Sequence, residues 1–185
     1  MRNGVAIRTK IAGKMKNIIN KCPPVIAFVC ALLLVSCKQV EDRLFVVERN
    51  ERYGYIDIKG DTVINCIYPL AYTDTIYKIG FVADYSGRIR CFSNKGEFLF
   101  FVYKYDNGPD YPSEGLFRIV DEKGLVGFAD TSGKIIVPPQ FRYAFPSVNG
   151  EAKVTKSGFL KIDSLSADIH EYWESEDWYY IKTKN

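Results

Sequence analysis

The sequence predicts an all-β protein, built as an array of antiparallel β-hairpin repeats of about 35 residues. First, Gly80, Gly115 and Gly150 each open a short apolar piece and recur every 35 residues. Second, three glycines that close polar turns recur at intervals of 36 and 37 residues: Gly60, Gly96 and Gly133. Third, short β-branched and aromatic runs separate the turns, and the repeated region contains no helical spacing.

Residues 1–36 have the organisation of a secretory signal peptide. Six basic and no acidic residues precede or flank an apolar run from Val25 to Val35. The run has 11 residues, whereas a membrane-spanning helix needs about 20. We therefore expect a cleaved signal, with Met15 as an alternative start because the basic stretch is unusually long.

The apolar run ends in Leu34-Val35-Ser36-Cys37, which resembles the lipobox of bacterial lipoproteins. The resemblance implies cleavage between Ser36 and Cys37 and acylation of Cys37, so that lipid holds the protein on a membrane. An ordinary signal followed by an incidental cysteine is the alternative. Residues 37–44 would form the tether, and its Glu41-Asp42 pair weakly resembles surface-export signals. We expect a bacterial cell-envelope location in the outer membrane, on either the periplasmic or the surface face.

Cleavage changes the charge of the chain. The whole sequence has 25 basic and 22 acidic residues, and removal of the six basic residues of the signal leaves 19 against 22. The mature net charge is then −3, and no Lys/Arg stripe alternates with aromatic residues. Nucleic acid is therefore not an expected partner.

The first unit is predicted to contain three strands and two polar turns. The strands are residues 45–47, 53–57 and 62–64, and the turns between them are residues 49–52 and 59–61. We expect Gly60 to adopt positive φ, and the Asp57 carboxylate to bond the backbone of the same turn.

The last unit repeats this pattern more clearly, again as strand, turn, strand, turn, strand. The strands are residues 116–120, 125–129 and 134–137, and the turns between them are residues 121–124 and 130–133. Asp130 and Gly133 take the roles of Asp57 and Gly60, and Gly96 takes the glycine role in the middle unit. Pro138-Pro139 is expected to end the third strand, because proline cannot donate a ladder hydrogen bond.

Two of these segments, Tyr53–Gly60 and Val126–Phe141, resemble the WG (also KWG) repeat. That unit reads tryptophan, glycine, aromatic, aliphatic, aspartate, then a turn glycine, a lysine-led strand and prolines. The resemblance covers residues 45–163 as three units and a truncated fourth at 156–163. It implies an all-β array with no shared enzymatic activity and no catalytic residues.

This chain departs from the family pattern at its two defining positions. The tryptophan is replaced by Tyr53, Ile89 and Val126, and Arg90 stands where the middle unit should have glycine. A second alignment is also open, in which Gly80–Gly87 matches Gly127–Gly133 with one insertion. We prefer the regular alignment, because it satisfies both glycine series.

Candidate reactive groups are few. Cys66 and Cys91 are allowed to form a disulfide in an oxidising compartment, but two buried thiols are the preferred interpretation. His170 is the single histidine, and we expect it on the solvated surface without a catalytic role. An acid–base pair of Asp57 and Asp130 is less consistent with their equivalent turn positions. We expect no enzyme activity, no metal and no cofactor.

The C-terminal segment 164–185 is aromatic and acidic. We expect it to cap the open end of the array, with 178–182 as a final edge strand. Its aromatic residues are also the candidate binding residues: Tyr172, Trp173, Trp178, Tyr179 and Tyr180. The sequence thus favours a membrane-anchored, non-enzymatic protein that binds a protein partner or acts as a scaffold. The alternative is a glycan-binding accessory lipoprotein that stacks Trp173 and Trp178 on sugar rings.

Overall fold

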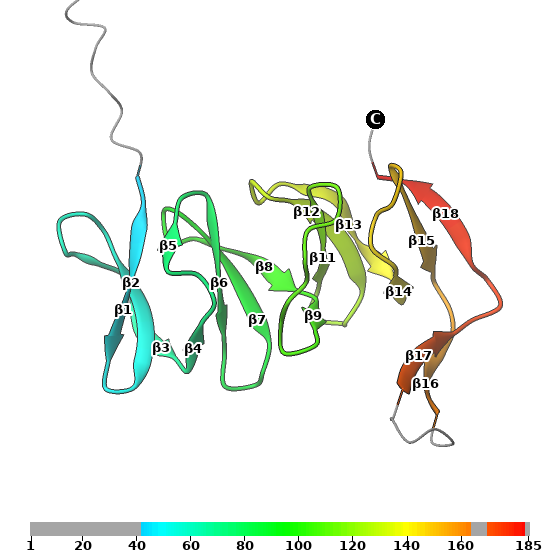
Figure 1. The fold of residues 1–185 in the computed structure, drawn as a ribbon, viewed down its shortest axis with the longest axis horizontal. Coiled ribbons are helices and arrows are strands. Elements are labelled where there is room, and N and C mark those ends of the chain that lie inside the picture. Colours follow the sequence, from blue (N-terminus) through cyan, green and yellow to red (C-terminus); the bar gives the residue numbers. More distant parts are fainter. Residues whose placement is uncertain (1–41, 164–169, 184–185) are drawn as a thin grey trace, which may run out of the picture. The chain divides into compact units, whose positions relative to one another are not determined.

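The computed structural model describes residues 42–163 and 170–183, and every regular element in these ranges is a β-strand (Figure 1). The all-β prediction is confirmed. The signal segment, Ser36, Cys37 and most of the tether lie outside the described residues. Within the ranges described, no helix is long and apolar enough to cross a membrane.

Three units of three antiparallel strands follow one another along the chain. In each unit the second strand is central and pairs with the first and the third. The strands are β1 (Leu44–Arg49), β2 (Arg52–Ile56) and β3 (Thr62–Tyr68); β6 (Ile79–Ala83), β7 (Ile89–Ser93) and β8 (Phe98–Val102); β11 (Leu116–Val120), β12 (Val126–Asp130) and β13 (Ile135–Phe141). The predicted strands of the first and last units agree with these bounds to within a few residues.

Short strands connect the units. They are β4 (Leu70–Ala71), β5 (Thr75–Ile76), β9 (Lys104–Tyr105), β10 (Gly108–Pro109) and β14 (Tyr143–Ala144). The first unit gains β5 beside β1, and β14 pairs with β15 (Glu151–Thr155). Because β8 pairs with β11, the second and third units share one seven-stranded sheet.

The apolar core consists of three clusters, and each cluster combines residues from two neighbouring units. Tyr55 of β2 is buried with Val82 of β6 in the first cluster, and Cys91 of β7 with Ile119 of β11 in the second. The third joins Phe128 of β12 to residues of β14 and β15. Each unit therefore buries its apolar face against its neighbour, as expected for a repeat array.

The turns are built alike. The Asp57 carboxylate accepts N–H bonds from Lys59 and Asp61 at 2.8 and 2.9 Å. In four other turns a side-chain oxygen likewise accepts from the N–H groups two and four residues later. These oxygens belong to Asp84, Ser93, Asp121 and Asp130. The second turn of each unit has its glycine at positive φ, with Gly60 at 89°, Gly96 at 79° and Gly133 at 90°. The predicted roles of these turn residues are confirmed.

In the series Gly80, Gly115 and Gly150, the predicted equivalence of the three glycines is wrong for Gly80. Gly115 and Gly150 both lie at positive φ in two-residue turns just before β11 and β15. Gly80 lies inside β6, paired with Phe92, and has no positive φ. The second alignment also fails, because the Asp84–Gly87 turn joins the first and second strands of its unit, whereas Asp130–Gly133 joins the second and third.

The third strands show why glycine follows the family's tryptophan position. Between Val126↔Phe141 and Phe128↔Val137, β13 contains two more residues than β12, and β3 bulges in the same way against β2. A Cβ on Gly127 would lie 2.5 Å from the Val137 carbonyl oxygen. The glycine therefore makes room for the bulge. Pro138-Pro139 lies inside this bulge, so the prediction that the prolines end the strand is wrong.

The middle unit lacks both the glycine and the two-residue bulge opposite it. Arg90 occupies the glycine position on β7, and β7 and β8 pair residue for residue from Ile89↔Val102 to Cys91↔Phe100. The Arg90 guanidinium lies 5.2 Å from the centre of the Phe98 ring, and its Nε lies 3.1 Å from Asp84 Oδ2. A side chain at this position is therefore accompanied by a third strand without the two-residue bulge, and the one register shift in this pairing lies further along, between Cys91 and Phe92.

Candidate functional site

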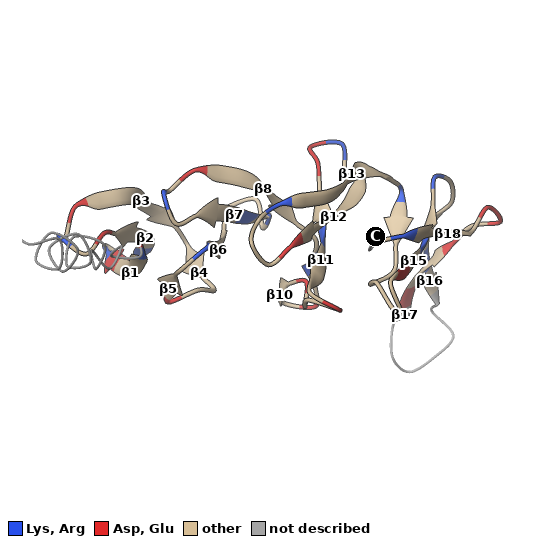
Figure 2. Ribbon diagram, turned by 90° about the horizontal axis from the view of Figure 1, so that it is seen from above, with Lys and Arg blue, Asp and Glu red and all other residues tan. Residues whose placement is uncertain are grey.

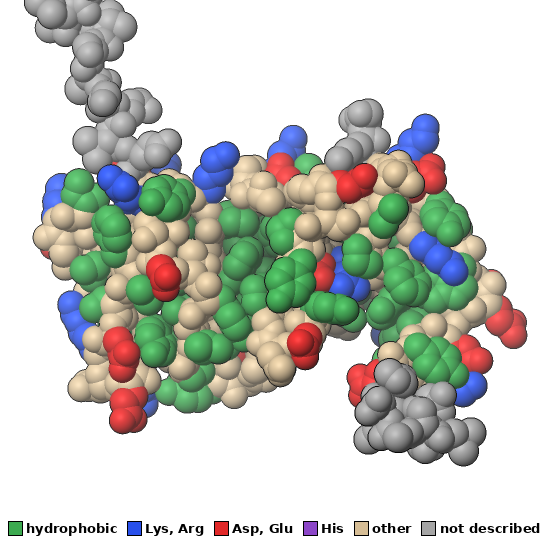
Figure 3. All heavy atoms as spheres, in the orientation of Figure 1, with side chains coloured by type: hydrophobic (Ala, Val, Ile, Leu, Met, Phe, Trp, Pro, Cys, Tyr) green, Lys and Arg blue, Asp and Glu red, His purple; other side chains and the backbone are tan. Residues whose placement is uncertain are grey.

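One concave feature of the described residues is a groove lined by aromatic side chains. It consists of two adjoining hollows of about 530 and 400 Å³ that share Tyr105, Asp110, Tyr111 and Pro112. We call it the aromatic groove and define it by these residues: Tyr72, Phe81, Tyr105, Asp110, Tyr111, Arg118, Tyr143 and Phe145. Figure 3 shows hydrophobic side chains gathered on this face over the middle of the described unit.

The most accessible groove residues are two tyrosines. Tyr105 comes from β9 and is 53% exposed, while Tyr111 follows β10 and is 73% exposed. Their rings are 6.3 Å apart and nearly perpendicular. Each ring therefore offers an apolar face and a hydroxyl to a ligand, a combination that suits recognition.

A buried ion pair forms the floor between these rings. The Arg118 guanidinium donates to both carboxylate oxygens of Asp110, at 2.9 Å from Nε and 2.5 Å from Nη2, and both side chains are less than 5% exposed. A third donor of Arg118, Nη1, reaches the Ala144 carbonyl oxygen at 3.1 Å. Burial alone would lower the pKa of Arg118, but the hydrogen bonds and charge of Asp110 outweigh it and raise that pKa. The two side chains satisfy each other's hydrogen bonds, so the pair fixes the shape of the groove floor.

The ring of Tyr103 lies behind this floor. The Arg118 guanidinium lies 4.1 Å from its centre. Burial, followed by the neighbouring Tyr143, raises the pKa of Tyr103 to about 12. Tyr103 is therefore a neutral support for the arginine at physiological pH.

The structure places both C-terminal tryptophans against one ring of the array. Trp173 stacks on Tyr143 at 5.4 Å and 16°, and its indole N–H donates to the Ser157 carbonyl oxygen at 3.0 Å. The Trp178 ring is nearly perpendicular to Tyr143 and tilted against Phe145, and the Lys153 ammonium lies 4.9 Å from its ring centre. Each indole is partly buried, so both side chains pack against residues of β14 and β15 and the segments that adjoin them.

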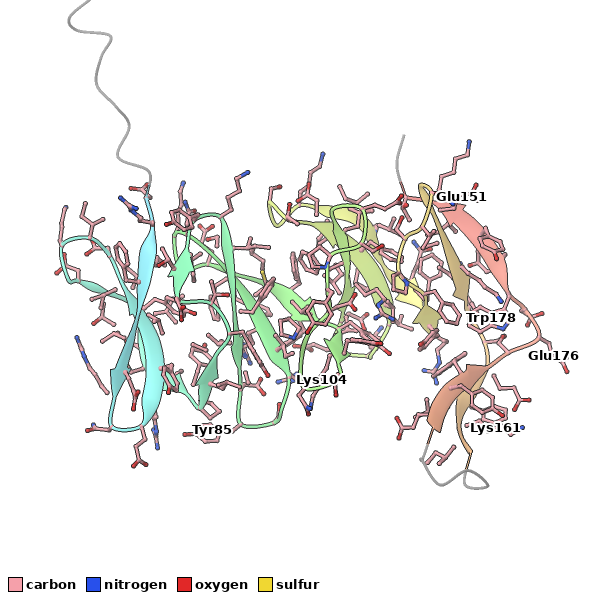
Figure 4. The ribbon with its side chains drawn as sticks, in the orientation of Figure 1. Tyr85, Lys104, Glu151, Lys161, Glu176 and Trp178 are labelled. Atoms are coloured by element: carbon pink, nitrogen blue, oxygen red, sulfur yellow. The ribbon has the colours of Figure 1, made fainter. Side chains whose placement is uncertain are left out.

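The three tyrosines of this segment are more exposed. Tyr172 belongs to β17 (His170–Glu174), whereas Tyr179 and Tyr180 belong to β18 (Tyr179–Lys182). β18 is the last strand of its sheet, as predicted for 178–182. Trp178, labelled in Figure 4, lies at the start of β18 beside β15.

The remaining candidate groups are not assembled into a site. Cys66 and Cys91 are free thiols, so the disulfide is not formed. Cys91 lies in the core, where burial raises its pKa to about 12, and the Cys66 thiol donates to the Val47 carbonyl oxygen. Asp57 and Asp130 each bond within their own turns.

In the ranges that the structure describes, no group of His, Cys, Asp and Glu side chains is arranged to hold a metal ion. Lysine and arginine residues are interspersed with acidic residues along the strands and turns (Figure 2). The described surface thus presents mixed charge around an aromatic centre.

The repeated strand–turn–strand units, their glycine-dependent bulges and their aspartate turns are matched by one family model. The model of the WG containing repeat matches residues 53–73 and 127–158. This is a WG-repeat protein. The matched segments begin at the two bulged units, and the unit that carries Arg90 lies outside both matches. Comparison with curated proteins and with solved structures gave no match.

Sequence reasoning missed the aromatic groove of this WG-repeat protein. Tyr105, Asp110, Tyr111 and Arg118 come from a connector and from β11, and only the fold brings them beside Tyr143. One signal was present in the sequence: tyrosines follow the third strand of each complete unit, at Tyr72, Tyr103, Tyr105 and Tyr143. Their recurrence points to one side of the array.

Proposed function

We propose that this WG-repeat protein is a membrane-anchored, non-enzymatic lipoprotein of the bacterial envelope whose aromatic groove binds a protein partner. The observation that carries the proposal is the pair of adjoining hollows with Tyr105 and Tyr111 exposed between them. Such a groove accepts an extended run of side chains, and tyrosine contributes contact area at a low entropic cost.

The anchor part of the proposal is carried by the Leu34–Cys37 sequence. Acyl chains on Cys37 would hold the repeat array at the membrane, because each buried CH₂ contributes about 0.8 kcal/mol. We expect Cys37→Ser to abolish incorporation of radiolabelled palmitate and to move the protein from the detergent phase to the aqueous phase in Triton X-114 partitioning.

Cys66→Ser is the matched control for this experiment, because it removes a thiol in the repeat array and leaves the lipobox intact. It should retain both the label and the detergent partitioning. Equal labelling of Cys37→Ser and the unmodified protein would contradict the lipoprotein assignment.

The binding part is tested by crosslinking in the native envelope. A photo-crosslinking residue at the exposed position Lys104, next to Tyr105 and labelled in Figure 4, should give one discrete protein adduct. Tyr105→Ala combined with Tyr111→Ala should reduce that adduct at least about tenfold, because exposed aromatic anchors dominate binding energy. The readout is the adduct band, followed by identification of the captured protein.

Tyr85→Ala provides the control, because Tyr85 is 70% exposed in the β6–β7 turn and does not line the groove. It should leave the adduct unchanged. An adduct of equal intensity in all variants would overturn the groove assignment. Loss of crosslinking on glycosidase treatment of the envelope would favour a glycan ligand instead.

A further inference from the structure

The fourth unit is assembled from strands that are not consecutive in the chain. Its first strand is β15, because the two-residue turn before β15 contains Gly150 as the turn before β11 contains Gly115. In the other units the next strand in the chain pairs with the first, but β16 (Phe159–Asp163) pairs with β17. The partner of β15 is β18, so the β16–β17 hairpin is inserted into the unit.

Strand register identifies β18 as the second strand of this unit. In the third unit Leu116 pairs with Asp130 and Arg118 pairs with Phe128. In the fourth, Glu151 pairs with Lys182 and Lys153 pairs with Tyr180. Alignment of β15 with β11 therefore places Tyr180 at the position of Phe128.

The same alignment carries Trp178 to the position of Val126, which is the position of the family's tryptophan. Trp178-Tyr179-Tyr180-Ile181 follows the tryptophan, glycine, aromatic, aliphatic order with tyrosine in place of glycine. The fourth unit expected at 156–163 thus differs from the one in the structure, whose second strand lies about twenty residues further along the chain.

Among the described strands, none pairs with the outer edge of β18. In the first three units this edge pairs with a third strand, β3, β8 or β13. Across residues 42–163 and 170–183, β15 is the only strand that pairs with β18. The Thr183 N–H donates to the Gly150 carbonyl oxygen at 2.9 Å, which marks a hydrogen-bonded pair. Because such pairs alternate along an antiparallel ladder, the peptide groups of Tyr180 and Lys182 point to the open edge.

We propose that this edge binds an extended segment of a partner protein, which pairs with β18 as an antiparallel third strand. The proposal concerns a second site, separate from the aromatic groove. Backbone hydrogen bonds to an exposed sheet edge give such strand addition its affinity. The support is the same pairing in each complete unit of this chain, and the 66% exposed Tyr180 side chain leaves the position accessible.

The middle unit indicates which kind of strand fits. Tyr179 occupies the glycine position, as Arg90 does in β7, and the strand beside Arg90 lacks the two-residue bulge and shifts register only once, between Cys91 and Phe92. The incoming strand should therefore resemble β8, with about five apolar residues. The incoming strand would begin beside Lys182, which occupies the position of Ser93 in the middle unit. There the Ser93 N–H donates to the carbonyl oxygen of Glu97, just before β8. An acidic residue at the start of the segment complements Lys182.

The probe is a fluorescein-labelled peptide of residues 97–103, with two extra glutamates at each end for solubility. We expect it to raise fluorescence anisotropy on titration with the full chain in detergent micelles. Tyr180→Pro removes the outward N–H and should weaken binding at least tenfold. Tyr180→Thr keeps that N–H in a strand-favouring residue and should bind as the unmodified chain does.

A second pair of probes makes the test independent of the fold of the proline variant. Two peptides carry N-methyl groups on alternate amides, and only the one whose unmodified amides face β18 should bind the unmodified chain. Failure of the unmethylated peptide to bind, or equal binding of the two methylated peptides, overturns the proposal. Combined Tyr105→Ala and Tyr111→Ala should leave peptide binding unchanged, so failure of the groove and failure of the edge are distinguishable.

Discussion

Asp110→Ala is expected to destabilise the repeat array by about 3–5 kcal/mol, because it leaves the Arg118 charge buried without its partner. Arg118 is 3% exposed, and its guanidinium is enclosed by the Asp110 carboxylate, the Ala144 carbonyl and the Tyr103 ring. The measurement is urea unfolding followed by tryptophan fluorescence, which reports on Trp173 and Trp178 beside Tyr143.

The double variant Asp110→Val with Arg118→Met separates loss of the pair from loss of packing. Two apolar side chains of similar size remove both charges, so much of the lost stability should return. Lys161→Met is a surface control, since the Lys161–Glu174 pair is half exposed on both sides and should matter little. An Asp110→Ala variant as stable as Lys161→Met would contradict the assignment of Asp110 and Arg118 as a structural pair.

The regular part of the fold was predictable because its causes are local. Asp57 and Asp130 bond amides two and four residues away, and Gly60 and Gly133 supply positive φ in the same turns. A turn of this kind is encoded within five residues, so its sequence pattern and its structure coincide. The misplaced Gly80 shows the limit, because glycine inside a strand gives the same letter as glycine in a turn.

The groove and the fourth unit were not predictable, because their causes are long-range. Arg118 of β11 pairs with Asp110, which lies in the connector before that strand. The segment that begins at Trp178 pairs with β15 only because β16 and β17 pair with each other as an inserted hairpin. Sequence proximity instead suggested that 156–163 continued the fourth unit. Pairing register, which spacing along the chain does not contain, decided which strand carries the family's tryptophan position.

The bulged third strands make one glycine a point of high sensitivity. Gly127 lies on β12 opposite the two extra residues of β13, and its backbone approaches Val137, Pro138 and Pro139. A Cβ there would lie 2.5 Å from the Val137 carbonyl oxygen and 2.6 Å from the Pro139 nitrogen. These are backbone atoms that no rotamer change relieves. The bulge and a side chain at residue 127 are therefore mutually exclusive.

Gly127→Ala should accordingly cost on the order of 3 kcal/mol in urea unfolding, at the upper end of ordinary overpacking. Gly124→Ala is the matched control, because Gly124 has φ of 76° and no atom within 4 Å of an added Cβ. Its left-handed backbone should cost only about 1 kcal/mol. Deletion of Pro138 and Pro139 in the Gly127→Ala background shortens β13 to the flat pairing seen beside Arg90, and should recover part of the loss. Gly127 itself has no positive φ, so a loss no larger than that of Gly124→Ala would contradict the assignment of the bulge as the reason for glycine at position 127.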